Sequence, residues 1–423
     1  MRTIQVGFLG CGNIGSGVWR LLEQMGEALE AREAVRFRVK RMLVRDVSKP
    51  RNGTIPFECL TTRIEDVLDD PDIALVVEML GGEQPAAAYM GRALESGKTV
   101  VTANKLALAM HWDELMQSAQ RGQAGLYFEA SVCGAIPVIR TLTDSLQANK
   151  ISQLFGIING TTNYILSRMT AEGSAYSDVL FDAQRLGLAE PDPTADVGGG
   201  DAACKLSILS TLAFRAQVTL PSIFRQGITA ITPLDITYGL QLGYALKLLA
   251  IAKRKGRTVQ ARVHPTFVPI AHPLASVSDA FNAIYLRGHA CGDMMLYGRG
   301  AGDNPTASAV VSDMIAAAKQ SQPPIYRTTG EVLMEEDWES RYFIRMAAVD
   351  RPGVLGAIAG ILGRHGVSIA SMRQTQGTDR VPLLFVTHVA REKAVRAALA
   401  EVDEGLATIE NVIYVEDMEE ESK

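Results

Sequence analysis

The chain has 423 residues and a mass of 45.7 kDa, with 47% hydrophobic and 21% charged residues, which is enough to form two or three globular domains. A net charge of −5 and a pI near 5.8 argue against a nucleic-acid-binding protein and against a basic helix on a membrane surface. Five scattered cysteines fit a reducing compartment, and the lack of a signal-peptide layout or a long apolar run predicts a cytoplasmic protein.

Residues 1–132 have the pattern of an α/β nucleotide-binding domain. Short apolar strands alternate with helical stretches, and the strands are IQVGFLG (4–10), ALVVEML (74–80), KTVVTAN (98–104) and GLYFEASV (125–132). This alternation is typical of right-handed βαβ units on a parallel sheet. We therefore predict a Rossmann-type domain.

The first motif in that domain is GCGNIG, residues 10–15, which has the G-x-G-x-x-G spacing. It closes a predicted strand and opens the helix NIGSGVWRLLEQM, which is the context that gives the motif meaning. Gly10 permits a tight turn, Gly12 lets the backbone approach a pyrophosphate, and the helix N-terminus offers unpaired N–H groups. The predicted cofactor-binding residues of this loop are Gly10, Gly12, Asn13, Ile14 and Gly15.

The turn after the second strand indicates which nicotinamide cofactor is bound. Val44, Arg45 and Asp46 stand where a carboxylate for the ribose 2′-hydroxyl is expected, and Lys49 and Arg51 follow. An arginine at this place accommodates a 2′-phosphate. The sequence favours NADP with NAD tolerated, and a solvated basic turn is the alternative.

Three further segments follow along the chain. Residues 133–320 form a predicted α+β catalytic and dimerisation domain with longer helices and irregular strands, ending in a strong helix from Thr306. Residues 321–340, with a proline pair and an acidic end, are predicted to be a linker. Residues 341–423 show a β-α-β-β-α-β order, which predicts a ferredoxin-like domain.

Hydride transfer to or from an alcohol needs a group that moves the hydroxyl proton. The chain shows no Ser-His-Asp arrangement, so lysine is the leading candidate. Lys105 follows the strand KTVVTAN at the carboxyl edge of the sheet, where open α/β folds bind ligands, and Lys205 ends the acidic stretch discussed next. A buried lysine has a lowered pKa and can act as acid or base, whereas a surface lysine is the alternative for each.

The stretch EPDPTADVGGGDAACK, residues 190–205, combines four carboxylates with three glycines and a lysine. A solvated surface loop is one interpretation. However, Asp201 and Lys205 are four residues apart in a predicted amphipathic helix, so they lie on one face near its N-terminus. Gly198–Gly200 lets the backbone approach another group closely. Such acids would suit a substrate that carries an ammonium group.

These residues fall within a pattern that resembles homoserine dehydrogenase. The run from Ala183 to Lys205 resembles the signature of that family, and four other segments look like its characteristic motifs: VTANK (101–105), FEASVCGAIPVI (128–139), GIINGTTNYILSRM (156–169) and GAGDNPTASAVVSD (300–313). The resemblance implies NAD(P)-dependent interconversion of L-homoserine and L-aspartate 4-semialdehyde, in the biosynthesis of threonine, methionine and isoleucine.

The resemblance also implies roles for individual residues. Lys205 aligns with the catalytic acid/base of the family and Lys105 with its partner, while Glu190, Asp196 and Asp201 align with acids that hold the substrate or orient the lysines.

Thr102 and Gly302 match positions near the cofactor. Thr162, in GTTN, either contacts the substrate or, like Thr161, caps a helix. Asp192 and Pro193 are interpreted as loop residues.

A monovalent cation, Na+, is a further implication of the resemblance, because Glu129 and the backbone of Val132, Gly134 and Ile136 align with a cation site near the nucleotide.

The chain departs from the family pattern at three positions. Leu188 stands where many relatives have an aromatic residue, and Cys133 and Cys204 stand where Ala, Gly or His is more usual. Thiol sensitivity and a simple buried role both remain open for the two cysteines.

The C-terminal segment resembles an ACT domain, a module that binds amino acids, usually across a pair of such domains. VDRPGVLGAIAGIL carries this resemblance, because Asp350 and the turn to Gly353 precede a helix whose N–H groups are free for a ligand carboxylate. We expect a homo-oligomer, dimer or tetramer, with threonine as the favoured effector. A module that only dimerises is the alternative.

Two other classes of protein fit the sequence less well. An amino-acid-binding regulator with a vestigial enzyme site would not need both Lys105 and Lys205. A bifunctional fusion with a kinase is not expected, because Met1 lies next to the first predicted strand.

Overall fold

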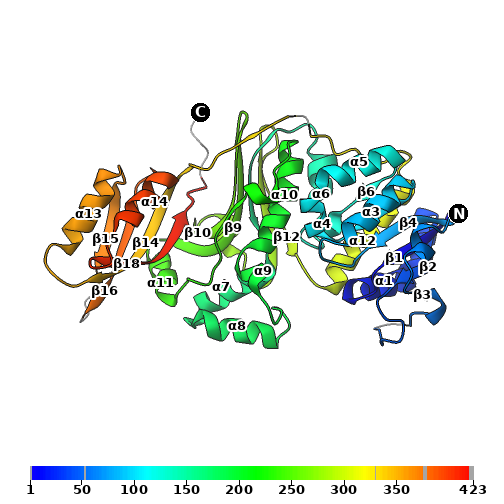
Figure 1. Ribbon diagram of the computed structural model, residues 1–423, viewed down its shortest axis with the longest axis horizontal. Coiled ribbons are helices and arrows are strands. Elements are labelled where there is room, and N and C mark those ends of the chain that lie inside the picture. Colours follow the sequence, from blue (N-terminus) through cyan, green and yellow to red (C-terminus); the bar gives the residue numbers. More distant parts are fainter. Residues whose placement is uncertain (1, 52–53, 329, 375–378, 419–423) are drawn as a thin grey trace. The chain divides into compact units, whose positions relative to one another are not determined.

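The computed structural model describes residues 2–51, 54–328, 330–374 and 379–418 (Figure 1). The chain forms two compact units, each assembled from several segments. The first comprises Met1–Ser152, Cys204–Pro221 and Leu286–Glu331, and the second comprises Gln153–Ala203, Ser222–Tyr285 and Val332–Lys423. Within the described ranges, none of the helices combines the length and the apolar composition needed to cross a membrane. The domain limits at residues 132, 320 and 340 remain a prediction.

The first unit is built on a six-stranded parallel sheet in the order β3-β2-β1-β4-β5-β6. This is the strand order of a Rossmann domain and confirms the predicted fold class. The strands are β1 Arg2–Leu9, β2 Val35–Leu43, β3 Leu60–Thr61, β4 Ile73–Glu78, β5 Thr99–Thr102 and β6 Leu126–Tyr127. The strand predicted at 125–132 is therefore too long. After β6 the chain turns into the 3-10 helix η2 (Glu129–Ser131), where the hydroxyl of Ser131 donates to the carbonyl of Phe128.

Helices cover this sheet, and one of them comes from much later in the chain. Helix α12 begins at Asp303, three residues before the predicted start, and packs against α1. A Cβ atom at Gly17 would lie only 3.3 Å from the carbonyl oxygen of Asp303, so glycine allows this close approach. The helices of the unit are α1 Asn13–Glu33, α2 Glu65–Leu68, α3 Ala86–Glu95, α4 Lys105–Met110, α5 Trp112–Gly122, α6 Val138–Arg140 and α12 Asp303–Lys319; strand β12 is Gly292–Arg299. Valines and methionines of α12 and the sheet form the core between them.

The second unit contains long antiparallel strands, which contradicts the prediction of irregular strands in residues 133–320. Strands β9 (Tyr244–Lys255) and β10 (Thr258–Pro269) pair along their full lengths, from Lys255 with Thr258 to Tyr244 with Pro269. Residues 248–252 of β9 form a continuous apolar run because both faces of the strand are buried. Strand β10 does alternate, with Val259, Ala261 and Val263 between polar residues, but polar side chains such as Arg262 and His264 are buried as well. The remaining elements are β7 Ile151–Ile157, β8 Phe224–Arg225, β11 Phe281–Gly288, α7 Gly160–Glu172, α8 Tyr176–Arg185, α9 Thr194–Val197 and α11 Pro233–Gln241. Helices α7 and α8 lie side by side (Figure 1).

The last part of the second unit has the predicted β-α-β-β-α-β order. Its elements are β14 Glu339–Val349, α13 Val354–Arg364, β15 Ile369–Gln374, β16 Arg380–Thr387, α14 Glu392–Glu401 and β18 Ala407–Val415, with the short strand β17 Ala390–Arg391. The sheet order within the unit is β11-β7-β9-β10-β18-β14-β16-β15, so this module extends the sheet of β9 and β10. Strand β13 (Leu333–Met334), inside the predicted linker, also pairs with β10.

Buried charges hold this module against β9, β10 and α11. Arg345 on β14 forms an ion pair with Asp235 on α11, with Nε and Oδ1 at 2.7 Å, and both side chains are buried. Glu416, just after β18, accepts from Lys253 at 2.7 Å and from Arg262 at 3.0 Å. The module is thus fixed to the preceding strands by pairing and ion pairs, and residues 321–340 are not its only connection.

Candidate functional site

The glycine turn between β1 and α1 has the geometry that the motif predicts. Gly10 has a φ of +97°, and a Cβ atom there would lie 2.9 Å from the carbonyl oxygen of Met79. The space around the Cα of Gly12 is open, and none of the described side chains caps α1. The first N–H groups of α1 are therefore available to an anion, which fits the pyrophosphate of a dinucleotide.

The turn after β2 presents a basic side chain to solvent. Val44 is buried, Arg45 is exposed, and Arg45 makes no hydrogen bond or ion pair with any other residue that the structure describes. Asp46 is used within its own turn, because its carboxylate accepts from the backbone N–H and the hydroxyl of Ser48 at 2.8 and 2.7 Å. One oxygen of the Asp46 carboxylate is thus bonded within the turn, and the Arg45 side chain is exposed.

A buried carboxylate, Glu78, organises the carboxyl ends of β4 and β5. Its oxygens accept from the hydroxyl of Thr102 at 2.5 Å, the backbone N–H of Leu80 at 2.8 Å and the amide of Asn104 at 3.3 Å. Burial raises the pKa of the Glu78 carboxyl, while these three donors lower it. Thr102 is itself fully buried, so its side chain lies in this network.

The same network sets the start of α4, whose first residue is Lys105. The carbonyl oxygen of the Asn104 side chain accepts from the backbone N–H of Ala107 at 3.1 Å and so caps the helix. Lys105, which is half-buried, is therefore anchored through Asn104 to Glu78. Gly302, the other expected cofactor residue, has a φ of +112° and directly precedes α12.

In the second unit, one amide group connects two of the predicted acids. The side-chain nitrogen of Asn159 donates to Asp196 at 2.7 Å and to Asp201 at 2.8 Å. Asp201 is buried and Asp196 is half-buried. Glu190 is exposed, so it does not share this environment. The structure thus brings together two of the acids that the sequence singled out.

The residues around GTTN differ from the expectation that Thr161 or Thr162 caps the helix. Asn159 is the N-cap of α7, because its side-chain oxygen Oδ1 accepts from the backbone N–H of Thr162 at 2.8 Å. Thr162 is buried, and its hydroxyl donates to Asn159. The hydroxyl of Thr161 donates to the carbonyl of Leu188 at 2.7 Å. Asparagine takes the cap because its amide can accept from the helix and donate to the acids at once.

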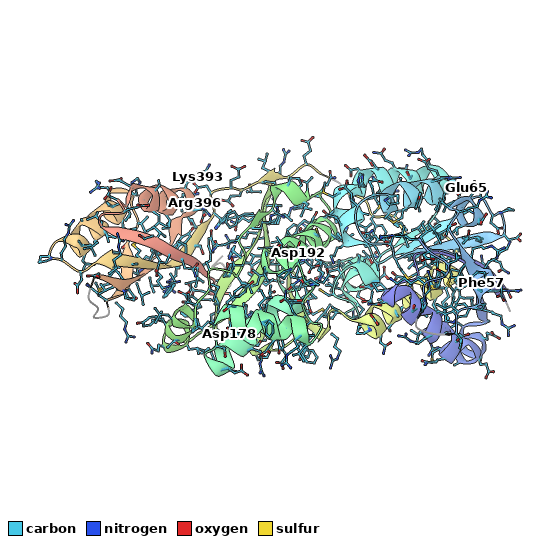
Figure 2. All side chains as sticks on the ribbon, turned by 60° about the horizontal axis from the view of Figure 1, so that its bottom comes forward. Phe57, Glu65, Asp178, Asp192, Lys393 and Arg396 are labelled. Atoms are coloured by element: carbon cyan, nitrogen blue, oxygen red, sulfur yellow. The ribbon has the colours of Figure 1, made fainter. Side chains whose placement is uncertain are left out.

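The loop before α10 confirms the loop role predicted for one acid. Asp192, labelled in Figure 2, is exposed and accepts from the backbone and hydroxyl of Thr194 at 3.1 and 2.6 Å. Gly199 has a φ of +79°, and a Cβ atom there would lie 3.2 Å from a methyl group of Val263. Glycine therefore allows the chain to enter α10 against β10.

Helix α10 (Gly200–Phe214) carries both Asp201 and Lys205, as predicted, but it is not amphipathic. Every residue from Asp201 to Thr211 is buried, because the helix is enclosed on all sides. Lys205 is 8% exposed and Asp201 is 7% exposed. Side chains four residues apart on a helix are neighbours, with Cβ atoms roughly 6 Å apart, so an acid and a lysine share one desolvated face.

Comparison with known proteins agrees with this arrangement. A family model described as "Homoserine dehydrogenase" matches residues 137–315, one described as "Homoserine dehydrogenase, NAD binding domain" matches residues 10–129, and an ACT domain model matches residues 342–404. The chain is 40% identical to the homoserine dehydrogenase of Bacillus subtilis over 405 residues, which cover 93% of each chain. The chain belongs to the homoserine dehydrogenase family.

Two further relatives support the same conclusion. The homoserine dehydrogenase of Mycobacterium bovis is 42% identical over 420 residues, covering 95% of both chains. A crystal structure of a homoserine dehydrogenase from Thiobacillus denitrificans has a TM-score of 0.89 and 39% identity, with 98% of each chain covered. The protein is therefore an NAD(P)-binding homoserine dehydrogenase of aspartate-family amino-acid biosynthesis, with a C-terminal ACT domain.

Glu129 of this dehydrogenase, the only side chain of the implied cation site, is buried in the first unit. Its carboxylate accepts from the backbone N–H groups of Ile139 at 2.7 Å and Arg140 at 3.0 Å. The guanidinium of Arg140 is 3.9 Å away and bonds instead to Asp313 at 2.9 Å. Burial raises the pKa of the Glu129 carboxyl to about 7. The part of the chain that the structure describes contains no cluster of three His, Cys, Asp or Glu side chains that could hold a metal ion.

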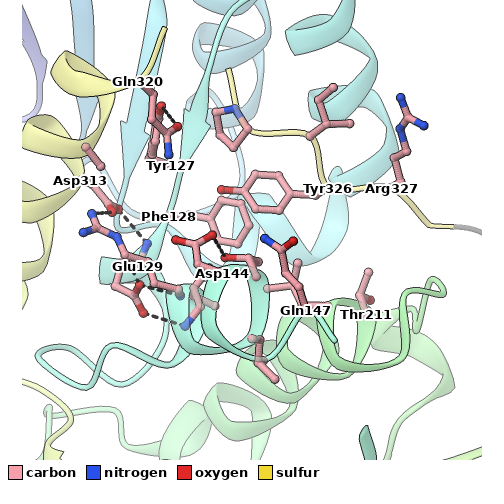
Figure 3. Close-up of a pocket in the computed structure, with 18 of the residues that line it drawn as sticks. Tyr127, Phe128, Glu129, Asp144, Gln147, Thr211, Asp313, Gln320, Tyr326 and Arg327 are labelled. Carbon is pink, nitrogen blue, oxygen red and sulfur yellow. Dashed lines mark hydrogen bonds and ion pairs between the residues drawn. The ribbon is translucent and has the colours of Figure 1, made fainter. Parts of the chain in front are cut away.

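Figure 3 shows Glu129, Asp313 and Tyr326 in the wall of a cavity of about 740 Å³. Tyr326, from the predicted linker, packs against Phe128 with ring centroids 4.8 Å apart. The linker is thus partly ordered against the first unit. Leu142, Thr211 and Arg327 also line the cavity, which gives it both apolar and polar walls.

The positions that depart from the family pattern have simple environments. Cys133 and Cys204 are both buried, with 1% and 7% of their surfaces exposed, which supports a packing role. Leu188 is 37% exposed.

Sequence reasoning missed Glu78, Asn159 and Lys247. Lys247 on β9 is buried and donates to the carbonyl of Val277 at 2.5 Å, and burial lowers its pKa to about 8. An acid at the carboxyl end of a buried strand and an asparagine just before a helix are signals that could have identified the first two. A lysine within an apolar strand gives no comparable signal of its partner.

The Glu129→Gln variant tests whether this buried carboxylate needs a cation. Because the pKa of Glu129 is raised from 4.5 to about 7, its contribution to stability is complete below about pH 4.5 and is lost as the pH rises through 7. We expect the variant to gain stability relative to the parent over that range, by about 1.4 kcal/mol for each unit of pKa shift. Thermal unfolding at several pH values measures this difference.

The same experiment at pH 8 compares NaCl with tetramethylammonium chloride at equal ionic strength. Sodium should raise the melting temperature of the parent and not that of Glu129→Gln, because an ion that binds only the folded state stabilises that state. Identical responses of the two proteins to sodium would remove Glu129 from the proposed cation site.

Proposed function

We propose that this dehydrogenase oxidises L-homoserine to L-aspartate 4-semialdehyde, and catalyses the reverse reaction, with Lys205 as the acid/base. The observation that carries the proposal is the pair of carboxylates held by Asn159, one of which lies one helical turn before the buried Lys205. A pair of acids next to a desolvated lysine suits a substrate that has both an ammonium group and a reacting hydroxyl.

In the oxidation, Lys205 accepts the proton of the substrate hydroxyl, and in the reduction it returns a proton to the carbonyl oxygen. Lys105, held at the start of α4, stabilises the charge that develops on the same oxygen. Asp201 orients Lys205 and, with Asp196 and Glu190, binds the substrate. Thr162 is assigned to the substrate-binding end of α7, where its buried hydroxyl supports Asn159.

The glycine turn and its surroundings suit a nicotinamide dinucleotide, which supplies the hydride acceptor or donor when bound. The residues that would hold it are Gly10, Gly12, Asn13, Ile14, Gly15, Val44, Arg45, Thr102, Lys105 and Gly302. The exposed guanidinium of Arg45, next to an Asp46 already bonded in its own turn, supports a preference for NADP with NAD tolerated.

A sodium ion near the nucleotide is the remaining cofactor that we propose. Glu129 and the backbone carbonyls of Val132, Gly134 and Ile136 would hold it. The fit rests on Glu129, a buried carboxylate whose nearest cationic group is 3.9 Å away and bonded elsewhere. A cation there would balance a charge that is otherwise costly to bury.

The Lys205→Met variant tests the central assignment. It should fold and bind NADPH normally but lose about 100-fold or more in kcat for homoserine, the usual scale for loss of an acid/base. Steady-state kinetics and fluorescence titration with NADPH measure the two effects. Lys98→Met is a matched control, because Lys98 is also buried in the first unit but bonds to the carbonyls of Asp70 and Ile73. Normal turnover by Lys205→Met would show that another group moves the proton.

The ACT domain is proposed to bind threonine as a feedback inhibitor. Asp350, Gly353 and Gln374 line a cavity of about 420 Å³. Gly353 precedes α13 with a φ of +92°, and within the described residues no side chain caps that helix. The N–H groups of α13 can thus donate to an amino-acid carboxylate, and Asp350 can accept from its ammonium group.

A homo-oligomer, dimer or tetramer, is also part of the proposal. Strand β15 lies at the edge of the ACT sheet, and its residues are exposed apart from Ile369, which is half-buried. An open sheet edge can pair with a second copy. Such pairing would also place two effector sites close together.

Inhibition assays with L-threonine test the regulatory proposal. Binding that distinguishes two conformations by typical coupling energies would change activity about 5- to 150-fold. Asp350→Ala should abolish the inhibition and keep the uninhibited rate, whereas Glu404→Ala, an exposed acid outside the cavity, should behave like the parent. If the parent ignores threonine, methionine and isoleucine alike, the module serves assembly and not regulation.

A further inference from the structure

The side chain of Asn159 performs three tasks at one point in the second unit. Its oxygen accepts from the backbone N–H of Thr162 at 2.8 Å, and its nitrogen donates to Asp196 at 2.7 Å and to Asp201 at 2.8 Å. The residue is only 5% exposed. One carboxamide therefore joins the start of α7 to acids on α9 and α10.

The orientation of this amide follows from the chemistry of its partners. An ionised carboxylate can only accept a hydrogen bond, and a backbone N–H can only donate one. The nitrogen of Asn159 must then face Asp196 and Asp201, and its oxygen must face Thr162. Both protons of the NH2 group are used, so neither acid can be released without leaving a buried donor unpaired.

We propose that Asn159 is a positioning residue, which holds Asp196 and Asp201 in the arrangement that receives the ammonium group of the substrate. This inference rests on the proposed role of the two acids. Without the amide, two like charges would repel each other and separate. With it, the two carboxylates are held together at one place that can receive a cation.

The charged groups around this point come from several elements. Asp196 lies on α9, Asp201 lies on α10, and Lys205 follows one turn later on α10. The guanidinium of Arg225, on β8, approaches the first residue of α10. Asn159 itself carries no charge, so the parent protein has no titrating group at this position.

The decisive variant is Asn159→Asp, which keeps an oxygen to cap α7 but replaces the NH2 group with an acceptor. Three carboxylates then share one site, and one of them must hold a proton to restore a hydrogen bond. Because that proton is lost as the pH rises, kcat/KM for homoserine should fall relative to the parent. We expect the ratio of parent to variant to increase at least about tenfold between about pH 6 and pH 9.

Two other variants separate this effect from a general loss of structure. Asn159→Ser keeps a good helix cap but supplies one donor that cannot reach both acids, so its kcat/KM should fall equally at all pH values. Asn163→Ala is a control on the same helix, because Asn163 is also buried but donates to the backbone carbonyls of Val277, Asp279 and Phe281, and alanine adds no titrating group. This control should not change the shape of the pH profile. Lys247 bonds to the same carbonyl of Val277 and is present in all variants, so it does not account for a difference between them.

The measurements are kcat and KM for homoserine with NADP+ between about pH 6 and pH 9, with the affinity for NADPH as a check on folding. A pH profile of Asn159→Asp parallel to that of the parent would overturn the inference. A KM for homoserine that is lower in Asn159→Asp than in the parent would also overturn it, because the added negative charge would then improve binding of the ammonium group. The Asp201→Asn variant distinguishes failure of the role proposed for the acids from failure of the role proposed for Asn159. If it is as active as the parent, the proposed role of the acids fails, whereas if it is impaired and only the Asn159→Asp profile is normal, the inference on Asn159 fails alone.

Discussion

Burial of a carboxylate costs free energy unless hydrogen-bond donors replace the water that it loses. Asp196 and Asp201, the acids proposed to bind the substrate, both accept from the side-chain amide of Asn159. The same amide caps α7, so the geometry of the acids depends on where that helix begins. The position of Asp201 then fixes one face of α10, on which Lys205 follows one turn later. The chemistry that we propose for Lys205 depends on this chain of contacts.

Similar donor sets hold buried acids elsewhere in the molecule. Glu78 is held by Thr102, Leu80 and Asn104, and so anchors the helix that begins at Lys105. On the ACT side, Asp235 pairs with Arg345, and Glu392 accepts from the hydroxyls of Tyr342 and Tyr414 at 3.0 Å each. Breaking one partner of such a pair leaves an uncompensated buried charge. Asp235 connects α11 to β14, and Glu416 connects β10 to the end of β18, which explains how the ACT module is attached to β10 and α11.

Much of this architecture can be predicted from sequence, because local rules determine it. The strand–glycine–helix context of residues 4–25 predicts the nucleotide turn, and the β-α-β-β-α-β order predicts the C-terminal module. Strand β9 is buried on both faces and lacks alternation over residues 248–252, whereas the alternation of β10 was an available signal for a strand. Helix α10 was expected to be amphipathic, but burial on all sides removes that pattern. The partners of Asn159 and Glu78 depend on contacts between distant segments, and no local rule identifies them.

The central claim is that Asp196 and Asp201 recognise the ammonium group of the substrate while Lys205 moves the hydroxyl proton. The most direct test compares homoserine with 4-hydroxybutyrate, which keeps the reacting alcohol and the carboxylate but lacks the amino group. With purified enzyme and NADP+, the account predicts that kcat/KM for 4-hydroxybutyrate is at least about 100-fold lower, since buried groups that bind the ammonium are left unpaired. Equal kcat/KM values for the two alcohols would contradict it.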